Sequence, residues 1–286
     1  MATTVTITGT GIPPAEPGRA GAGTLVRFAG DDGTTVALQF DAGRATSLRL
    51  AEAGQRVADL DAVFITHHHS DHVSGAPDLV FCAWVNRPVS TNLDFVAPTG
   101  PSTRFLERML DPYDEDLAIR VAHTDRELPV PRIHGFTATE EPVEVWARGG
   151  VRVLARAVHH HPVDPAVAYR VETPDGVVVI SGDTRVCDEV EDFSTGADVL
   201  VHEVLRIEEF VARSGDERAR VIGDYHADSV ALGAMTARAE PAVLMLTHMT
   251  PSPRSSIERD AFVDDIRAGG YEGVVMVCDD LDSHDF

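Results

Sequence analysis

The sequence contains no lysine, and arginine supplies all 24 of its basic residues. Because 46 acidic residues oppose them, the 286-residue chain has a formal net charge of −22 at pH 7. A field of this sign repels nucleic acid at long range and disfavours non-specific binding to phosphates. We therefore expect a small-molecule substrate and consider nucleic acid an unlikely partner. The missing lysine itself is best explained by GC-rich coding, with a salt-adapted source as the alternative.

Cysteine is scarce and long apolar runs are absent. The three cysteines, Cys82, Cys187 and Cys278, lie far apart and form no C-x-x-C pair, so we expect free thiols in a reducing compartment. No run of about 18 apolar residues occurs, which argues against a membrane-spanning helix and against a membrane partner. The N-terminus enters a β-branched stretch without the basic and apolar segments of a secretory signal. Together these absences predict a cytoplasmic protein.

Short runs rich in valine, isoleucine and leucine recur along the chain and predict strands covered on both faces. The predicted strands are 4–8, 24–29, 34–40, 61–66, 151–158, 167–173, 176–181, 197–203, 242–247 and 273–278, and the predicted helices are 44–54, 100–110, 226–240 and 255–270. A block of strands followed by strands mixed with helices occurs twice. This order predicts an α/β fold in a single domain, residues 1–286, in which two sheets pack together with helices on the outer faces.

The motif ITHHHSDH places four histidines and an aspartate within six positions, at the end of an apolar run. Residues two apart on a strand point the same way and lie roughly 6.6 Å apart, so His67 and His69 can converge on one ion while His68 faces away. The chain then turns and brings Asp71 and His72 back towards the same place. Imidazole combined with carboxylate suits Zn, with Mn or Fe as alternatives. A solvated polar loop is the other interpretation, which this spacing at a strand end disfavours.

The stretch THHHSDH resembles the signature of hydrolases with the metallo-β-lactamase fold. Other stretches resemble further blocks of that family, namely TGTGIPPAEPGRAG, FDAGR, HHHPVDPAVAYRVE, VVISGDT, ADVLVHEV and the segment from DYHADS to THMTP. Together they are most similar to the branch that contains ribonuclease Z and arylsulfatase-like enzymes. The resemblance implies a four-layered αβ/βα sandwich of two mixed β-sheets flanked by helices. It also implies two divalent metal ions, most simply zinc, as cofactors.

The resemblance further implies which residues hold the metals. The first ion would be held by His67, His69, His160 and Asp183, and the second by Asp71, His72, Asp183 and His248, so that Asp183 bridges the two. Within the three consecutive histidines, the family spacing favours His160, and His161 stays open as an alternative. A lone histidine or aspartate at a strand end is more often structural, so the assignments of Asp183 and His248 depend on the family pattern.

Catalytic residues are implied in the same way. We expect Asp71, His226 and Glu203 to be catalytic, with His226 donating a proton to the leaving oxygen and Glu203 orienting it. His202 is expected to support a ligand. The alternative is that His226 caps a helix and forms a buried ion pair with Glu203. The family usually has threonine or serine after this histidine, whereas Ala227 follows here, and this departure puts the geometry of the pair in doubt.

Substrate-binding groups are less clearly marked. Tyr225 and Arg170 are candidates, although Arg170 lies inside a predicted strand, where it more often faces solvent or pairs with an acid. Residues 103–147 contain ten acidic residues and five arginines and are the least regular part of the chain. We expect them to form an exposed insertion or cap near the active site. The acidic tail from Cys278 to Phe286 is expected to be solvated or to cap an element.

The expected function is a dinuclear metal-dependent hydrolase whose metal-bridging hydroxide cleaves a small phosphodiester, a sulfate ester or a related ester. A lactonase, or another carboxyl-ester or amide hydrolase of the same fold, is the first alternative. A transfer-RNA 3′-processing nuclease is disfavoured by the negative charge and by the lack of a basic arm. A non-catalytic metal-binding protein is disfavoured because every expected ligand is present. A homodimer is implied by the resemblance alone.

Overall fold

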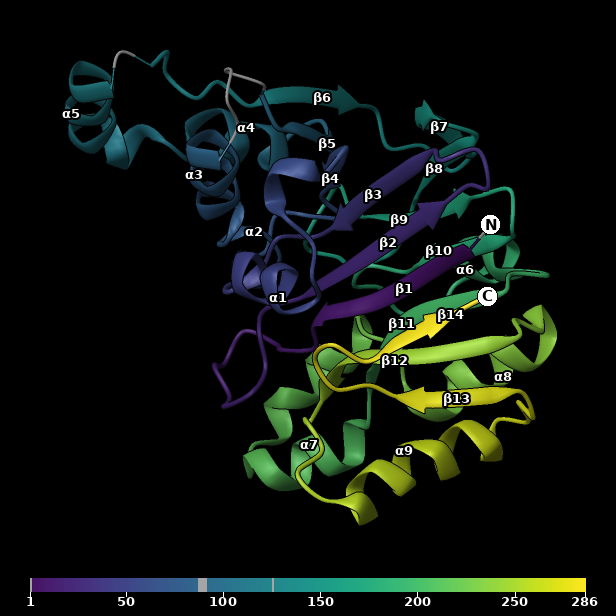
Figure 1. The fold of residues 1–286 in the computed structure, drawn as a ribbon. Helices are drawn as coiled ribbons and strands as arrows, with labels where there is room; N and C mark the ends of the chain where they lie inside the picture. The colour runs from purple at the N-terminus through teal and green to yellow at the C-terminus, as the bar shows by residue number, and fades with distance from the viewer. Residues whose placement is uncertain (1, 87–91, 125) are drawn as a thin grey trace.

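The computed structural model describes residues 2–86, 92–124 and 126–286 (Figure 1). The first of its two seven-stranded sheets has the order β14–β1–β2–β3–β4–β5–β6. Its strands are β1 (Ala2–Gly9), β2 (Gly23–Ala29), β3 (Thr35–Phe40), β4 (Ala62–Phe64), β5 (Asp94–Pro98), β6 (Arg132–Phe136) and β14 (Ser283–Asp285). Strands from β14 to β3 pair antiparallel, and those from β3 to β6 pair parallel, so the sheet is mixed.

The second sheet repeats this plan with the order β13–β12–β11–β10–β9–β8–β7. Its strands are β7 (Val143–Arg148), β8 (Val151–Ala157), β9 (Val167–Glu172), β10 (Val177–Ile180), β11 (Val199–Leu205), β12 (Val243–Thr250) and β13 (Val274–Val277). Strands from β7 to β10 pair antiparallel, and those from β10 to β13 pair parallel. The block that occurs twice in the sequence is therefore one mixed sheet each time.

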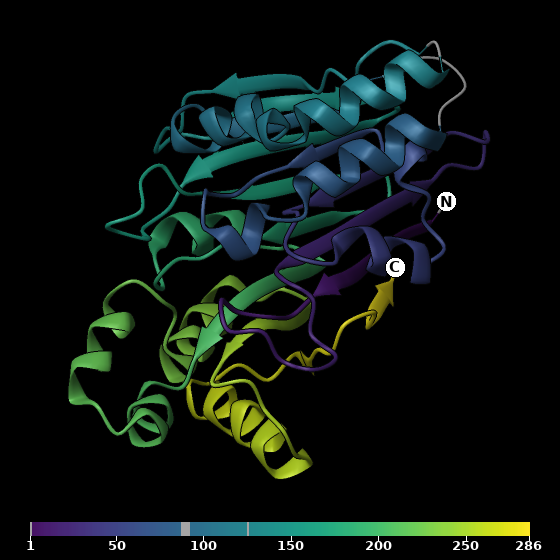
Figure 2. The same ribbon diagram turned by 90° about the vertical axis from the view of Figure 1, so that its left-hand side faces the viewer.

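Helices cover the outer face of each sheet (Figures 1 and 2). The first half of the chain contributes α1 (Thr46–Glu52), α2 (Ser70–Val73), α3 (Ala76–Asn86), α4 (Pro101–Arg108) and α5 (Asp114–Thr124). The second half contributes α6 (Asp188–Ser194), α7 (Ile207–Ser214), α8 (Ser229–Ala239) and α9 (Ser256–Ala268). Short 3-10 turns cover Val57–Asp59, Asp111–Tyr113 and Glu217–Asp224. Two helices begin at a polar cap: the Asp228 carboxylate accepts from the first backbone N–H groups of α8, and the Ser255 hydroxyl does so for α9.

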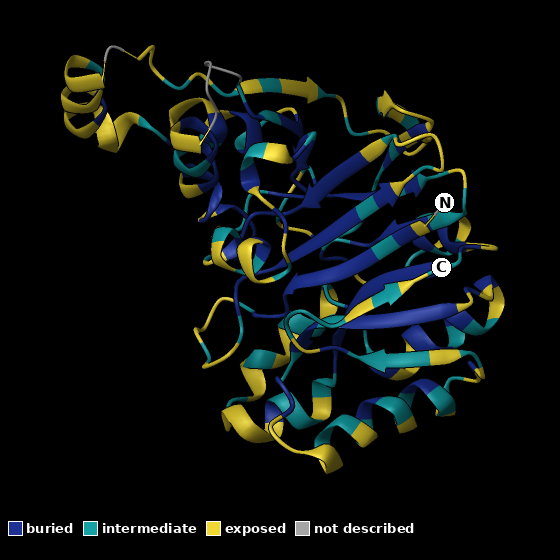
Figure 3. Cartoon of the chain, in the orientation of Figure 1, coloured by how far each residue is buried: buried dark blue, intermediate teal, exposed yellow. Residues whose placement is uncertain are grey.

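Three apolar layers fill the spaces between these elements, and Figure 3 shows the central strands of both sheets as mostly buried. One layer joins the two sheets and contains Phe40, Phe64 and Tyr169, whose rings lie 4.8–5.4 Å apart. The second packs the first sheet against α1, α3 and α4, and the third packs the second sheet against α6, α8 and α9. Four structural layers around these cores confirm the predicted αβ/βα sandwich.

The strand that leads to the HHHSDH motif is fixed to the opposite sheet. The hydroxyl of the fully buried Tyr169, in β9, donates to the carbonyl of Ile65 at 2.8 Å. Ile65 follows β4 directly and precedes Thr66 and His67, so this bond fixes the backbone two residues before the first histidine of the motif. The inter-sheet core thus sets the position of the candidate site.

Several sequence-based expectations need correction. The tail is not merely solvated, because β14 pairs with β1 and the Asp280 carboxylate accepts hydrogen bonds from Thr10, Ala20 and Arg49. Residues 103–147 are more regular than expected, since they contain most of α4, all of α5, and the edge strands β6 and β7. That this segment acts as an insertion or cap near the site stays a prediction.

None of the helices in the described ranges has the length and apolar character needed to cross a bilayer.

The three cysteines are free thiols, as expected. The homodimer stays a prediction.

Candidate metal centre

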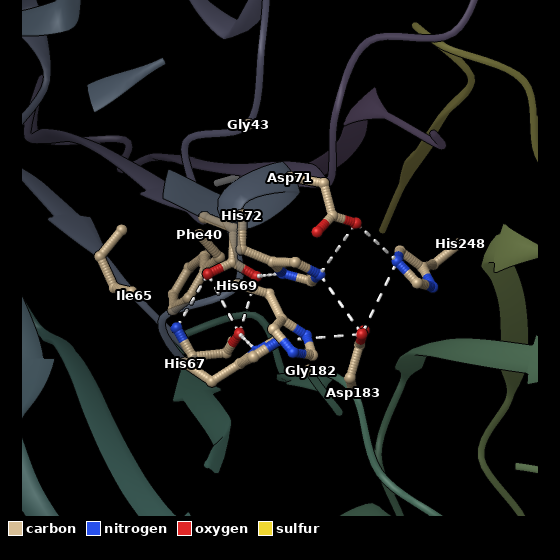
Figure 4. A network of polar contacts seen from close by, with 12 residues as sticks. Phe40, Gly43, Ile65, His67, His69, Asp71, His72, Gly182, Asp183 and His248 are labelled. Atoms are coloured by element: carbon tan, nitrogen blue, oxygen red, sulfur yellow. Dashed lines mark hydrogen bonds and ion pairs between the residues drawn. The ribbon is translucent and has the colours of Figure 1, made fainter. Parts of the chain in front are cut away.

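The predicted ligands meet at the carboxyl ends of strands from both sheets (Figure 4). His67 and His69 follow β4, and α2 then turns Asp71 and His72 towards them. Asp183 lies three residues beyond the end of β10, and His248 lies near the end of β12. Because parallel strands of one sheet end at the same edge, residues distant in sequence are brought to one place.

Two groups of side chains are each compact enough to hold one metal ion. The first group is His67, His69, His160 and Asp183, and the second is Asp71, His72 and His248; within each group the ligand atoms all lie within 4.8 Å of one another. A third group of this kind, Asp183, His226 and His248, overlaps the other two. All seven predicted ligands, and His226, are thus brought together.

Asp183 lies between the two groups. Its Oδ2 atom is 3.8 Å from Nε2 of His67 and 3.9 Å from Nε2 of His160 on one side. On the other side it is 3.4 Å from Nε2 of His72 and 3.6 Å from Nε2 of His248. A carboxylate with this position can contribute to two ions at once.

Unpartnered buried atoms indicate that these residues fit metal ions. Nε2 of His67, Nε2 of His72 and Oδ1 of Asp71 are buried and form no hydrogen bond with any described residue. A buried polar atom without a partner is costly, so a group that satisfies several of them together is expected. Imidazole nitrogens and carboxylate oxygens in this number are ligands for divalent metal ions.

Asp41, which lies in the FDAGR stretch, orients the second group. Its Oδ2 accepts a hydrogen bond from Nδ1 of His72 at 2.7 Å, which leaves Nε2 of His72 facing Asp183. Its Oδ1 accepts from the backbone N–H of Thr66 at 2.8 Å. Asp41 directly follows β3 and has φ of 56°, a left-handed conformation that is strained for a non-glycine residue and is found at functional sites. Such hydrogen bonds fix the ring and tautomer of a metal-binding histidine.

The structure distinguishes among the three consecutive histidines. His160 is buried and its Nδ1 donates to the backbone carbonyl of Tyr225 at 3.0 Å, so that Nε2 faces the cluster. His161 is exposed, and His159 instead pairs with Glu189 at 3.2 Å. Of the two alternatives, the geometry therefore favours His160.

A bulge directs His248 into the site. The pairing of β11 with β12 shifts register after Glu203 and Thr247, so that His248 has no partner across the ladder. His248 has φ of 46°, and its Nε2 lies 3.2 Å from Oδ2 of Asp71. An extra residue in a strand re-aims its side chain, and bulges of this kind are common next to active sites.

His226 and Glu203 are hydrogen bonded to each other, and proton donation by His226 stays a prediction. Oε1 of the buried Glu203 accepts hydrogen bonds from Nδ1 of His226 at 2.8 Å and from the backbone N–H of Thr184 at 2.9 Å. Burial alone would lower the pKa of His226, but the Glu203 carboxylate raises it to about 9. His202 contacts this pair through the backbone, because its Nδ1 donates to the carbonyl of Glu203 at 2.6 Å, and its expected support of a ligand stays a prediction.

The pKa values of the clustered side chains are shifted in different directions. Burial lowers the pKa of His67 and, aided by neighbouring imidazoles, lowers that of His69 to about 4. Burial acts in the same direction on His72, but the carboxylates of Asp183 and Asp41 raise its pKa well above its usual range. Burial would raise the pKa of Asp183, yet the imidazoles that face it hold that pKa well below its usual range. Such perturbed groups in one place are typical of a functional site.

The fold and the cluster define a class of αβ/βα proteins whose metal ligands converge from the strand ends of two facing sheets. The family model for the metallo-beta-lactamase superfamily matches residues 19–221, and the chain belongs to this superfamily. A curated ribonuclease Z from Mycobacterium bovis (strain BCG / Pasteur 1173P2) is 34% identical over 252 residues, covering 87% of this chain and 86% of that protein. The expectations of a metallo-β-lactamase fold and of a hydrolase are confirmed.

Solved structures share the fold at lower identity. YhfI from Bacillus subtilis, a metallo-beta-lactamase fold protein, is similar with a TM-score of 0.73 at 19% identity, and the alignment covers 100% of both chains. The short form of human tRNase Z is similar with a TM-score of 0.66 at 18% identity, and the alignment covers 98% of both chains.

These comparisons correct one expectation. Nucleic acid was considered an unlikely partner, in favour of a small-molecule substrate, because of the net charge of −22. A curated relative that covers most of the chain is named as a ribonuclease, which contradicts that expectation. The physical reason is that net charge describes the far field of the whole chain, whereas binding depends on the local charge where the substrate lies. Two divalent ions would add four positive charges at that place.

Proposed function

We propose that the protein hydrolyses phosphodiester bonds in RNA with the help of two divalent metal ions, most simply zinc. The central position of Asp183 between two groups of histidine and aspartate side chains carries the proposal. The substrate class is supported by the 34% identity to a ribonuclease Z over 87% of the chain. The proposal includes a cytoplasmic location, which the three free cysteines support.

In this proposal His67, His69 and His160 would hold the first ion and Asp71, His72 and His248 the second, and Asp183 would be available to both. When bound, the ions supply hydroxide near neutral pH and stabilise negative charge on the phosphoryl oxygens. His160 is kept in the required tautomer by the Tyr225 carbonyl, and His72 by Asp41.

The chain's own groups position the nucleophile and supply the proton for the leaving oxygen. Oδ1 of Asp71, which has no hydrogen-bond partner among the described residues, would orient the attacking hydroxide by accepting its hydrogen. As hydroxide adds to phosphorus, the bond from phosphorus to the leaving oxygen breaks and that oxygen takes a proton from Nε2 of His226. Glu203 remains ionised and stabilises the imidazolium before the transfer through its 2.8 Å hydrogen bond to Nδ1. An RNA hydroxyl is a poor leaving group, so this proton matters for the rate.

A substrate panel tests the proposal. The purified protein would be assayed on a tRNA precursor with a 3′ extension, bis(p-nitrophenyl) phosphate, p-nitrophenyl sulfate and a set of lactones, with metal content measured on the same sample. We expect cleavage of the RNA and of the phosphodiester. Hydrolysis of only the sulfate or a lactone, with the RNA intact, would overturn the substrate assignment. A metal-free protein inactive on every compound, even after metal is added, would instead support a non-catalytic role.

A further inference from the structure

Tyr225 lies against the candidate metal centre without being one of its ligands. It directly follows the 3-10 turn Glu217–Asp224 and directly precedes His226. Its ring centroid is 5.4 Å from that of His160, in an edge-on arrangement, and 5.1 Å from that of His226, in a tilted one. The residue as a whole is neither fully buried nor fully exposed.

The backbone on either side of this ring is held in place. The Tyr225 carbonyl accepts the 3.0 Å hydrogen bond from Nδ1 of His160, and its N–H donates to the carbonyl of Ile222 at 3.3 Å. Two residues later, the carbonyl of the buried Ala227 accepts from the N–H of Leu205, at the end of β11. The ring itself packs against the imidazoles of His160 and His226, and an aromatic side chain supported in this way loses little freedom when it stacks on a flat group.

We propose that Tyr225 is a specificity-determining residue that stacks on the base of the nucleoside carrying the leaving oxygen. The inference rests on the proposed function. His226 has to reach the leaving oxygen to protonate it, and Tyr225 is the adjacent residue, with its ring 5.1 Å from the imidazole. The nucleoside attached to that oxygen is therefore the one brought beside the Tyr225 ring. Single-stranded RNA is commonly held by bases stacked on aromatic side chains.

This role differs from a purely structural one in which the ring only shields His160 and His226. A shielding ring would affect every substrate alike, whereas a stacking ring affects only substrates that have a base on the leaving side. The two roles also separate in the kinetic constants, because stacking on the ground-state substrate acts mainly through KM and disturbed histidines act mainly through kcat.

The test uses short RNA substrates with an abasic nucleotide on the leaving side or on the opposite side of the cleaved bond. We expect the leaving-side abasic substrate to raise KM of the wild type by about 5- to 150-fold, the range for one stacked base. Y225A and Y225L should raise KM for the complete RNA by a similar factor. On the leaving-side abasic substrate, their KM should equal that of the wild type. Y225F should behave as wild type, and Y113A, which removes an exposed tyrosine in another part of the fold, should have no effect.

A binding measurement and a stability measurement accompany the kinetics. The inhibition constant of the leaving-side product oligonucleotide should weaken by the same factor in Y225A, and thermal unfolding should show that Y225L and Y225F are folded. If the wild type leaves all RNA intact, the proposed function and this inference both fail. Two outcomes would refute only the role of Tyr225 while RNA cleavage by the wild type is observed. In the first, removing the leaving-side base leaves KM of the wild type unchanged. In the second, Y225A raises KM by the same factor on both abasic substrates.

Discussion

Replacing Asp41 by asparagine changes one oxygen to an amide nitrogen, yet it should weaken binding of the second metal ion. In the wild type, Asp41 Oδ2 accepts from Nδ1 of His72 at 2.7 Å, while both oxygens lie within 3.1 Å of the Thr66 hydroxyl. Asparagine keeps one acceptor oxygen, but the –NH₂ group cannot accept, so either His72 or Thr66 loses its partner. His72 also loses the adjacent negative charge that strengthens its donation to a metal.

The expected loss of metal affinity in Asp41→Asn follows from similar hydrogen bonds to metal-binding histidines. Removing such a partner typically costs about 10- to 100-fold in metal affinity, which corresponds to roughly 1.4–2.8 kcal/mol of binding free energy. The effect should be concentrated on the ion held by His72. The first ion should be affected less, because its histidines contact Asp41 only through the Thr66 hydroxyl, which lies 3.0 Å from Nδ1 of His67.

The assay is a competition titration of zinc against a chromophoric chelator of known affinity. Asp61→Asn is the matched control. Asp61 directly precedes β4, at the end of the strand opposite to the site, and it accepts a hydrogen bond from the backbone N–H of Ala37. The control should keep both metal affinities even if it lowers the free energy of unfolding. Metal affinities of Asp41→Asn within twofold of wild type at both sites would refute the orienting role of Asp41.

Three further predictions concern the proton donor, the metal ligands and the core. His226→Ala should lower kcat on RNA by about 10²- to 10⁴-fold. It should lower kcat on bis(p-nitrophenyl) phosphate much less, because that leaving group needs no proton. An equal fall in kcat on both substrates in steady-state assays would count against proton donation. The carboxylates of Asp183 and Asp41 raise the pKa of His72 well above its usual range, so a metal ion has to compete with a proton for this ring. Metal loading should therefore release protons, and metal affinity should fall as pH is lowered; a weakly buffered indicator titration without proton release would contradict this. Tyr169→Phe leaves the buried Ile65 carbonyl unsatisfied and should cost about 1–3 kcal/mol of unfolding free energy, measured in urea; an unchanged midpoint would show that this bond does not hold β4 in place.

The repeated strand pattern predicted packed sheets with outer helices, the family resemblance of the HHHSDH motif and its companion stretches implied the four-layered sandwich, and the spacing within the motif predicted the local part of the cluster. Signals of this kind are short-range: an apolar run followed by chelating side chains. Four strands were missed, β5, β6, β7 and β14, and two of them carry weak signals. β6 is an edge strand with exposed and half-buried residues, and β14 has only three residues and exists because it pairs with β1. The helix α3 was missed because its apolar sequence lacks a clear polar face.

The unpredicted parts of the site depend on contacts between distant segments. Asp41 precedes His72 by 31 positions, and nothing near either residue in sequence indicates that they are hydrogen bonded. The family spacing favoured His160 over His161, but the hydrogen bond that orients His160 comes from the Tyr225 carbonyl, 65 positions further along. The expectation about nucleic acid failed for a different reason, because it took the sum of all charges as a measure of the field at one place.

Metal content of the wild type and of Asp183→Ala, measured by mass spectrometry on purified protein together with phosphodiesterase activity, tests the central claim most directly. Asp183 is the carboxylate that both groups of ligands face, at 3.4–3.9 Å from four imidazole nitrogens. We predict two divalent ions per wild-type chain, and loss of at least one ion and of phosphodiester cleavage in the variant. An Asp183→Ala protein that is folded, retains two ions and remains active would contradict the account.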